Sequence, residues 1–219
     1  FLPWQVPLYG DELTIALDAN SLLQTGNDQL GDSFPLTFKM GAGRPAGYVY
    51  GIIPFVALFG PSELGVRMLS IISGLGLVLL MFYLGRMLVN EKTGIAVAFL
   101  TAISPWDINL SRGGFEAHFA LFLTVAGILA FLKSKTSPIY LLITALCFGL
   151  TIHTYPTYKV TLPLLLLVLI WFRGNLKYYW QKKILPYSIS ALVILLFAGI
   201  LAIFQTFSAG SEQRFLTIN

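Results

Sequence analysis

The clearest indication of the fold is "ELGVRMLSIISGLGLVLLMFYLGRMLV", residues 63–89. Between Arg67 and Arg86 it holds no charged residue. A helix needs about 20 predominantly apolar residues to cross the hydrocarbon core of a bilayer. This segment therefore predicts a transmembrane helix.

The composition of the whole chain also indicates a membrane protein. Of its 219 residues, 56% are hydrophobic and only 11% are charged, whereas a soluble domain carries about 25% charged residues. The net charge is +4, but the basic residues form no patch with interleaved aromatics, so we expect no nucleic-acid partner. The single cysteine, Cys147, excludes a disulfide framework or a cysteine metal site within the chain.

Six apolar segments are candidate spans, and they predict an all-α fold: a polytopic transmembrane helix bundle with extracytoplasmic juxtamembrane helices. The second, fourth and fifth are short, so they are expected to tilt or to extend into their flanks. The segments are 63–89, 92–106, 115–132, 138–154, 158–173 and 184–207.

The segments divide the chain into three parts. Residues 1–62 are expected to form an extracytoplasmic loop with an amphipathic helix near 12–25 and an apolar helix near 46–59. Residues 63–208 would form the six-span bundle, and 209–219 the start of the next extracytoplasmic loop.

The loops between the segments alternate in charge. Eight of the 14 Lys and Arg residues, with the single acid Glu91, lie in the loops after the first, third and fifth segments, while the other nine acids lie on the opposite side. Basic loops stay in the cytoplasm. The acidic loops are therefore expected to face outward across the plasma membrane, and any chemistry is expected on that side.

An acidic pair, Asp11 and Glu12, precedes the amphipathic stretch. One interpretation is a solvated interfacial helix capped by Asp11, with Asp18 on its polar stripe and Leu13 and Leu17 on its apolar face. The other makes one carboxylate a general base that accepts the proton of an attacking hydroxyl.

Two further clusters lie in outward loops. In "SPWDINLSRGGFEAH" (104–118), Arg112 could hold a phosphate through a bidentate contact or form an ion pair with Glu116, four residues away. The second cluster, "HTYPTYK" (153–159), could bind an anionic head group or form an aromatic belt. Its candidate residues are His153, Tyr155, Tyr158 and Lys159.

Arg67 starts the first span one helical turn after Glu63. This spacing is typical of a structural pair, although Arg67 could also point toward the outer site. The chain has no phosphate-binding loop of the G-x-x-x-x-G-K-[ST] type and no GxSxG or HExxH motif. A donor would therefore have to arrive already activated, which suggests a lipid-linked phosphate.

Taken together, the motifs resemble the membrane glycosyltransferases of superfamily C, in the branch of the dolichyl-phosphate-mannose protein mannosyltransferases and the lipid A aminoarabinose transferases. The resemblance covers nearly the whole chain, through the order and spacing of its motifs. These motifs are "YGDELTIALDANSLLQTGND", "FPLTF", "LFGPSELGVRMLSIISG", "SPWDINLSRGGFEAHFALF", "YPTYK" and "EQRFLTIN". The family has a span before its acidic loop and several after it, so the resemblance implies that this chain is an interior fragment.

The resemblance implies an inverting transfer of a sugar from a polyprenyl-phosphate carrier to an acceptor hydroxyl of a protein or lipid. Asp11 would be the base and Glu12 a supporting acid. The substrate-binding residues would be Arg112, Glu116, Arg67, His153, Tyr155 and Lys159. Many relatives have Arg near the position of Lys159, and Lys lacks the planar fork of Arg. No cofactor and no metal ligand is expected, with a divalent metal left open.

Two other functions remain open on the sequence alone. A transporter or lipid flippase would carry polar residues or broken helices near mid-membrane, whereas the charges here lie near the ends of the spans. A non-catalytic membrane scaffold would predict that Asp11 is dispensable.

Overall fold

The computed structural model describes residues 6–39, 43–173 and 176–207. It has the predicted all-α architecture, with one hairpin of two short strands. The elements are α1 (Gly10–Thr25), β1 (Thr37–Phe38), β2 (Arg44–Pro45), α2 (Gly47–Phe59), α3 (Glu63–Leu88), α4 (Glu91–Ala102), α5 (Pro105–Ser111), α6 (Glu116–Lys133), α7 (Ile139–Ile152), α8 (Tyr158–Arg173), the 3₁₀ helix η1 (Leu176–Trp180) and α9 (Leu185–Phe207). The predicted loop 209–219, with its "EQRFLTIN" motif, lies outside the described residues.

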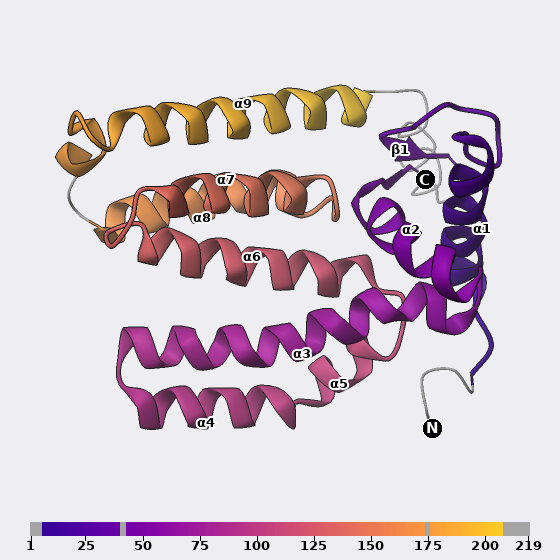
Figure 1. Cartoon of the computed structure of the whole chain (residues 1–219), viewed down its shortest axis with the longest axis horizontal. Coiled ribbons are helices and arrows are strands. Elements are labelled where there is room, and N and C mark those ends of the chain that lie inside the picture. The colour runs from indigo at the N-terminus through magenta and orange to yellow at the C-terminus, as the bar shows by residue number, and fades with distance from the viewer. Residues whose placement is uncertain (1–5, 40–42, 174–175, 208–219) are drawn as a thin grey trace, which may run out of the picture.

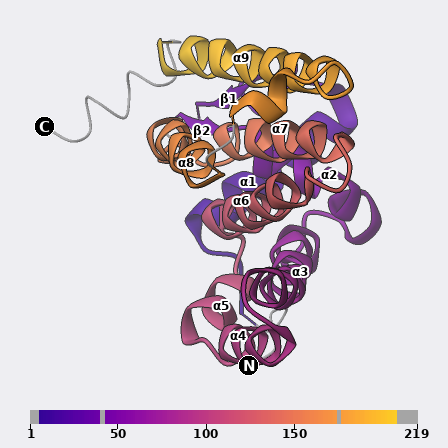
Figure 2. The ribbon, with the colours of Figure 1, turned by 90° about the vertical axis from the view of Figure 1, so that its left-hand side faces the viewer.

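The long helices run side by side in one bundle (Figures 1 and 2). Helix α4 packs on α3, α3 on α6, α6 on α7 and α7 on α9, while α8 lies beside α7. The described parts of the loops predicted to face outward lie at one end of this bundle, and the described parts of the basic loops lie at the other end. This geometry agrees with the alternation of charge along the sequence.

Three described helices are long and apolar enough to cross a membrane, namely α3, α6 and α9. Each begins and ends close to its predicted segment. Helices α4, α7 and α8 are shorter, with 12, 14 and 16 residues. The predicted second segment, 92–106, is wrong at its end, because α4 stops at Ala102 and Pro105 begins the separate helix α5. The chain is thus an integral membrane protein whose spans differ in length.

Local signals explain where the first two helices of the bundle start and how they pack. The Ser62 hydroxyl accepts a hydrogen bond from the Gly65 amide (3.3 Å), and the Asn90 side chain accepts one from the Thr93 amide (2.9 Å). Such N-caps satisfy backbone donors that would otherwise lack a partner. At the basic end, a Cβ added to Gly85 would lie only 3.0 Å from the Cα of Gly94. The absence of side chains therefore lets α3 and α4 approach closely.

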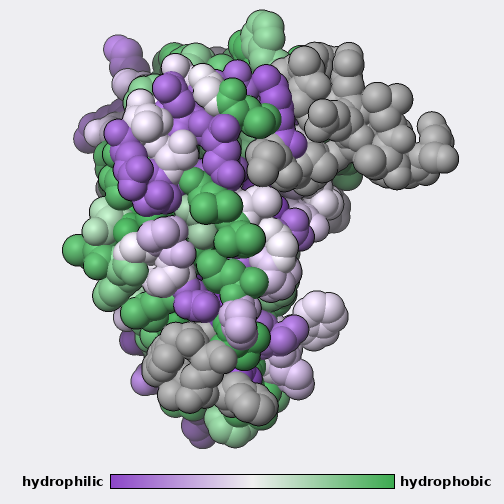
Figure 3. Space-filling view, turned by 90° about the vertical axis from the view of Figure 1, so that its right-hand side faces the viewer, coloured by the Kyte–Doolittle hydropathy of each residue, from purple (hydrophilic) through white to green (hydrophobic). Residues whose placement is uncertain are grey.

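The end of the bundle that the sequence predicts to face outward, called the outer end below, is covered by α1, α2 and the hairpin (Figure 1). Helix α2 agrees with the predicted helix near 46–59, and Ile15, Ala19, Tyr48 and Ile52 belong to the core beneath this layer. Helix α1 starts at Gly10 and its N-cap is Tyr9, with no side-chain cap bond. The predicted capping role of Asp11 is therefore wrong, since Asp11 lies in the first turn. Figure 3 looks onto this end, where hydrophilic and hydrophobic side chains are mixed.

The predicted faces of α1 also need correction. Asp18, expected on the solvated stripe, is 1% exposed, whereas Leu13 and Leu17 are 47% and 40% exposed. The loop that follows α1 folds back over Asp18, and the side-chain amide of Gln29 donates a hydrogen bond to its Oδ1 atom (3.2 Å). Periodicity along one helix could not reveal this contact, because it comes from a separate segment.

Asp18 gives a pH-dependent prediction for stability. Burial raises its pKa above the ordinary 3.8, because it disfavours the charged carboxylate. In the pH range between the unfolded and folded pKa values the folded state binds more protons, so the free energy of unfolding falls as pH rises through that range. We expect Asp18→Asn to raise the melting temperature at pH 7 by roughly 2–4 °C and to bring no gain below about pH 4.

Thermal unfolding of the purified protein between pH 4 and pH 8 measures this effect. Asp32→Asn is the matched control, because that carboxylate is exposed in an ion pair with Lys39. An unchanged or lower melting temperature of Asp18→Asn at pH 7 would show that the buried carboxylate does not destabilise the fold.

Candidate active site

The acidic pair of α1 is split between two environments. Glu12 is fully buried, whereas the side chain of Asp11 is 77% exposed. The two residues are adjacent on a helix, so their side chains point about 100° apart. The carboxylate of Glu12 can therefore form contacts inside the protein, while that of Asp11 lies at the surface.

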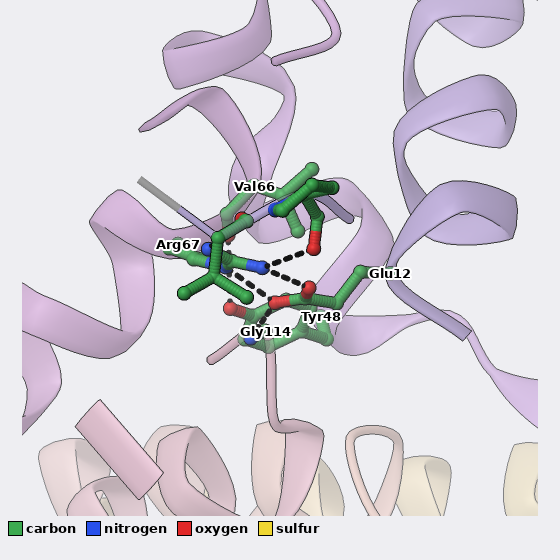
Figure 4. A network of polar contacts seen from close by, with 7 residues as sticks. Glu12, Tyr48, Val66, Arg67 and Gly114 are labelled. Carbon is green, nitrogen blue, oxygen red and sulfur yellow. Dashed lines mark hydrogen bonds and ion pairs between the residues drawn. The ribbon is translucent and has the colours of Figure 1, made fainter. Parts of the chain in front are cut away.

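Glu12 is held by a network that joins three elements (Figure 4). The Arg67 Nε atom donates to Glu12 Oε1 (2.7 Å), and the Arg67 Nη2 atom forms an ion pair with Glu12 Oε2. The amide of Gly114 also donates to Oε1 (2.7 Å). Arg67 in addition donates to the carbonyl of Val6 (2.8 Å). The charge of Glu12 is thus paired and hydrogen-bonded, as a buried carboxylate requires.

The neighbouring layer supports this network. The Tyr48 hydroxyl donates to the carbonyl of Val66 (3.0 Å) and lies 2.7 Å from the Ser70 hydroxyl. A Cβ added to Gly114 would lie 2.8 Å from Val66 Cγ1 and 3.4 Å from Glu12 Oε1. Gly114 therefore permits the close backbone approach that places its amide on Glu12.

Asp11 is positioned by a residue that the sequence analysis did not single out. Arg44, opposite Phe38 in the hairpin, donates from Nη2 to Asp11 Oδ1 (3.1 Å) and from Nη1 to the Thr14 hydroxyl (2.9 Å). Its Nε atom forms an ion pair with Glu116. The Arg44 side chain is only 4% exposed, so its guanidinium is fixed between α1 and the start of α6.

Arg44 lies in "GAGRPAG", which reads as a flexible turn. The sequence feature that could have indicated Arg44 as a site residue is that it is the one charged residue in the glycine-rich segment 41–47. In the structure Glu116 forms an ion pair with Arg44, and Arg67 forms one with Glu12. Arg112 lies exposed at the C-cap of α5.

Two carboxylates of the site contact the same guanidinium. Asp11 and Glu116 share the single cation of Arg44, while Glu12 is neutralised by Arg67. Burial, and then the carboxylates of Glu12, Asp11 and Glu116, raise the pKa of Tyr9 to about 12. Tyr9 therefore keeps its proton at neutral pH.

The second predicted cluster lies at the junction of α7 and α8. His153 Nδ1 lies 2.9 Å from the Gln205 side-chain oxygen, and the Gln205 amide donates to the carbonyl of Leu36 (2.7 Å). The His153 carbonyl accepts from the Gly47 amide (2.8 Å). These contacts attach the outer layer to the bundle on either side of Arg44 in the sequence.

Lys159 and Tyr155 complete this cluster. The Tyr155 ring packs edge-to-face against Tyr158, with centroids 6.4 Å apart. Lys159 lines a cavity of about 460 Å³ whose other lining residues are almost all aliphatic, from α7, α8 and α9. Such a cavity places one cation against a long apolar surface.

Within the part of the chain that the structure describes, no group of three or more His, Cys, Asp or Glu side chains is placed to hold a metal ion. What the site offers is one exposed carboxylate that is oriented by a buried guanidinium. This arrangement can accept a proton from a hydroxyl group at the outer end of the bundle.

Comparisons with known proteins agree with this architecture. Residues 44–203 match the family described as dolichyl-phosphate-mannose-protein mannosyltransferase. A search of curated proteins gave no match. Two crystal structures of ArnT from Cupriavidus metallidurans are similar in fold.

The apo form of ArnT has a TM-score of 0.70 at 12% identity, over 92% of this chain and 38% of that one. The form bound to undecaprenyl phosphate has a TM-score of 0.69 at 15% identity, over 93% of this chain and again 38% of that one. The chain therefore spans well under half the length of the solved structures that it matches.

Proposed function

Because the chain belongs to the dolichyl-phosphate-mannose-protein mannosyltransferase family, we propose that it carries the outer catalytic face of a membrane glycosyltransferase. The enzyme would move a sugar from a polyprenyl-phosphate carrier to an acceptor hydroxyl of a protein or lipid, on the extracytoplasmic side of the plasma membrane. The observation that carries this proposal is the exposed carboxylate of Asp11, which a buried arginine holds over the end of the bundle.

In this proposal Asp11 is the general base. Its Oδ1 atom is occupied by Arg44, and its side chain is largely exposed, so an acceptor hydroxyl can approach the carboxylate from outside. Arg44 also pairs with Glu116, so the positive charge beside Asp11 is shared between two carboxylates. Glu12 and Arg67 then act as positioning residues, because they fix α1 on the bundle from a buried site.

The donor would lie along the cavity between α8 and α9. Its aliphatic walls, which include Leu162, Leu166 and Leu195, suit a prenyl chain. The ammonium of Lys159 would hold the phosphate, which leaves as a dianion when the bond to the sugar breaks. Arg112, His153 and Tyr155 are further candidates for contact with the head group, each from the same end of the bundle.

The ArnT structure bound to undecaprenyl phosphate supports this choice of carrier by analogy, since the two folds are similar. Assay of the full-length protein in lipid nanodiscs with a labelled polyprenyl-phosphate sugar tests the function. We expect acceptor-dependent release of polyprenyl phosphate. In proteoliposomes, movement of the intact donor across the bilayer without cleavage would indicate a flippase and overturn the proposal.

Replacement of Lys159 gives a separate prediction for donor binding. Lys159→Gln removes one charge-assisted contact, which is typically worth about 1.5–3 kcal/mol. We therefore expect the KM for the lipid donor to rise by roughly 10- to 100-fold, as measured from initial rates of release. Lys135→Gln is the matched control, because Lys135 lies exposed in a loop at the opposite end of the bundle. An unchanged KM in Lys159→Gln would remove this residue from the donor site.

A further inference from the structure

We propose that Asp107 and His118 form a positioning pair that fixes the start of α6 and, through it, the geometry of Asp11. The inference rests on the function proposed above for Asp11, but it concerns residues outside that site. His118 Nε2 lies 2.9 Å from Asp107 Oδ1. His118 is fully buried and the Asp107 side chain is 11% exposed. The bond joins α5 to α6 across the turn that contains Gly113 and Gly114.

The apolar surroundings of the pair explain why this hydrogen bond fixes the orientation of the His118 ring. The two side chains lie at one edge of a cavity of about 470 Å³ that is otherwise mostly apolar, with Leu77, Leu121 and Val125 among its lining residues. In such surroundings a hydrogen bond is strong and an unpaired polar group is costly. Among the described residues, His118 Nδ1 is buried without a hydrogen-bond partner. Asp107 is thus the polar contact that fixes the orientation of the ring.

Helix α3 provides the surface against which the pair is set. A Cβ added to Gly74 would lie 3.1 Å from His118 Cε1 and 2.9 Å from Ser111 Cβ. The Ser111 hydroxyl in turn donates to the carbonyl of Asp107. The His118 ring and the end of α5 therefore pack on the same position of α3, with no space for either to shift inward.

The segment between the two residues contacts both halves of the candidate site. Gly114 donates its amide to Glu12, and Glu116 forms an ion pair with Arg44, which contacts Asp11. Gly114 and Glu116 lie four and two positions before His118 in the sequence. A shift in the start of α6 would therefore move the partners of Glu12 and of Arg44 together. Misplacement of a reacting group by about 1 Å can lower a rate by about 100-fold.

The pair thus predicts a specific kinetic effect. His118→Leu keeps a buried apolar side chain but loses the hydrogen bond, and we expect kcat to fall by roughly 10- to 100-fold. The KM for the lipid donor is expected to change much less than kcat, because the cavity beside Lys159 is formed by other helices and Arg112 is the one head-group candidate in the segment that would shift. In His118→Gln the side-chain amide can replace Nε2 as a donor, so most of the loss in kcat is expected to be recovered.

A double variant checks that the two residues act as one unit. Asp107→Leu combined with His118→Leu is expected to lose no more activity than either single variant, because residues in contact are non-additive. Tyr178→Phe is the matched control. Its hydroxyl donates to the Ser134 carbonyl just beyond the opposite end of α6 (2.6 Å), and its loss is expected to leave kcat unchanged.

Hydrogen exchange measured by mass spectrometry gives a second readout that needs no activity. In His118→Leu we expect faster exchange at the start of α6 and also in residues 10–16 of α1, with wild-type exchange in His118→Gln and in Tyr178→Phe at α1. Unchanged exchange in α1, or unchanged kcat per folded protein with only a lower melting temperature, would overturn the positioning role. Failure of the proposed function is a different outcome: the wild-type protein itself would then release no polyprenyl phosphate.

Discussion

Replacement of Asp11 by asparagine is expected to lower kcat for sugar transfer by roughly 100- to 10,000-fold, the usual contribution of a general base. The amide oxygen of asparagine can still accept the hydrogen bond from Arg44, so α1 is expected to keep its place. The change removes the negative charge that would receive the proton of the acceptor. The measurement is the initial rate of polyprenyl-phosphate release by the full-length protein in nanodiscs.

The control for this experiment is Asp32→Asn. Asp32 is also an aspartate in contact with a cation, Lys39, but both side chains are about 40% exposed; Asp32 lies in the loop after α1, and Lys39 follows β1. We expect wild-type rates in that variant. Turnover of Asp11→Asn at the wild-type rate, with the same amount of folded protein, would exclude Asp11 as the base.

The second large effect is expected on stability. Arg67→Met would leave Glu12 buried without its counter-ion, and loss of one partner of a buried pair costs about 3–5 kcal/mol. We therefore expect a strong fall in the melting temperature and in the yield of monodisperse protein. The double variant Glu12→Gln with Arg67→Met carries no lone charge, so part of the stability is expected to return.

Lys39→Met serves as the reference for this comparison, because an exposed ion pair contributes at most about 1 kcal/mol. If Arg67→Met melts at the wild-type temperature, the network around Glu12 does not fasten the outer layer to the bundle. The measurement is the melting temperature of the wild type, of Arg67→Met, of the double variant and of Lys39→Met, all in the same detergent and at the same pH.

The sequence was sufficient to predict the bundle, because its signals are local. Hydropathy locates the spans within one or two residues at α3, α6 and α9, where Ser62 marks the first start. The alternation of charge between the loops predicts which loops lie at the same end of the helix bundle. The end of α4 was missed, because a run of apolar residues continues past Ala102 into a turn before α5.

The candidate site was predicted only in part, because its geometry depends on contacts between distant segments. The partner of Glu12 is Arg67, 55 residues away, and not a neighbour on α1. Arg44 was missed because its glycine-rich surroundings indicate a turn and give no sign that the guanidinium is buried. Asp107 and His118 both lie in the quoted stretch 104–118, but their bond depends on α5, a helix that the sequence analysis did not predict.

The long reach of these contacts has a consequence for biosynthesis. The bond between Gly114 and Glu12 joins residues 102 positions apart, and the bond between Gln205 and Leu36 joins residues 169 apart. At a ribosomal rate of about 5–20 residues per second, roughly 8 to 34 s pass between the emergence of Leu36 and that of Gln205. The contacts of Gly114 and Gln205 can therefore form only after α6 and α9 have been synthesised, so the packing of the first 60 residues on the bundle is completed late in synthesis.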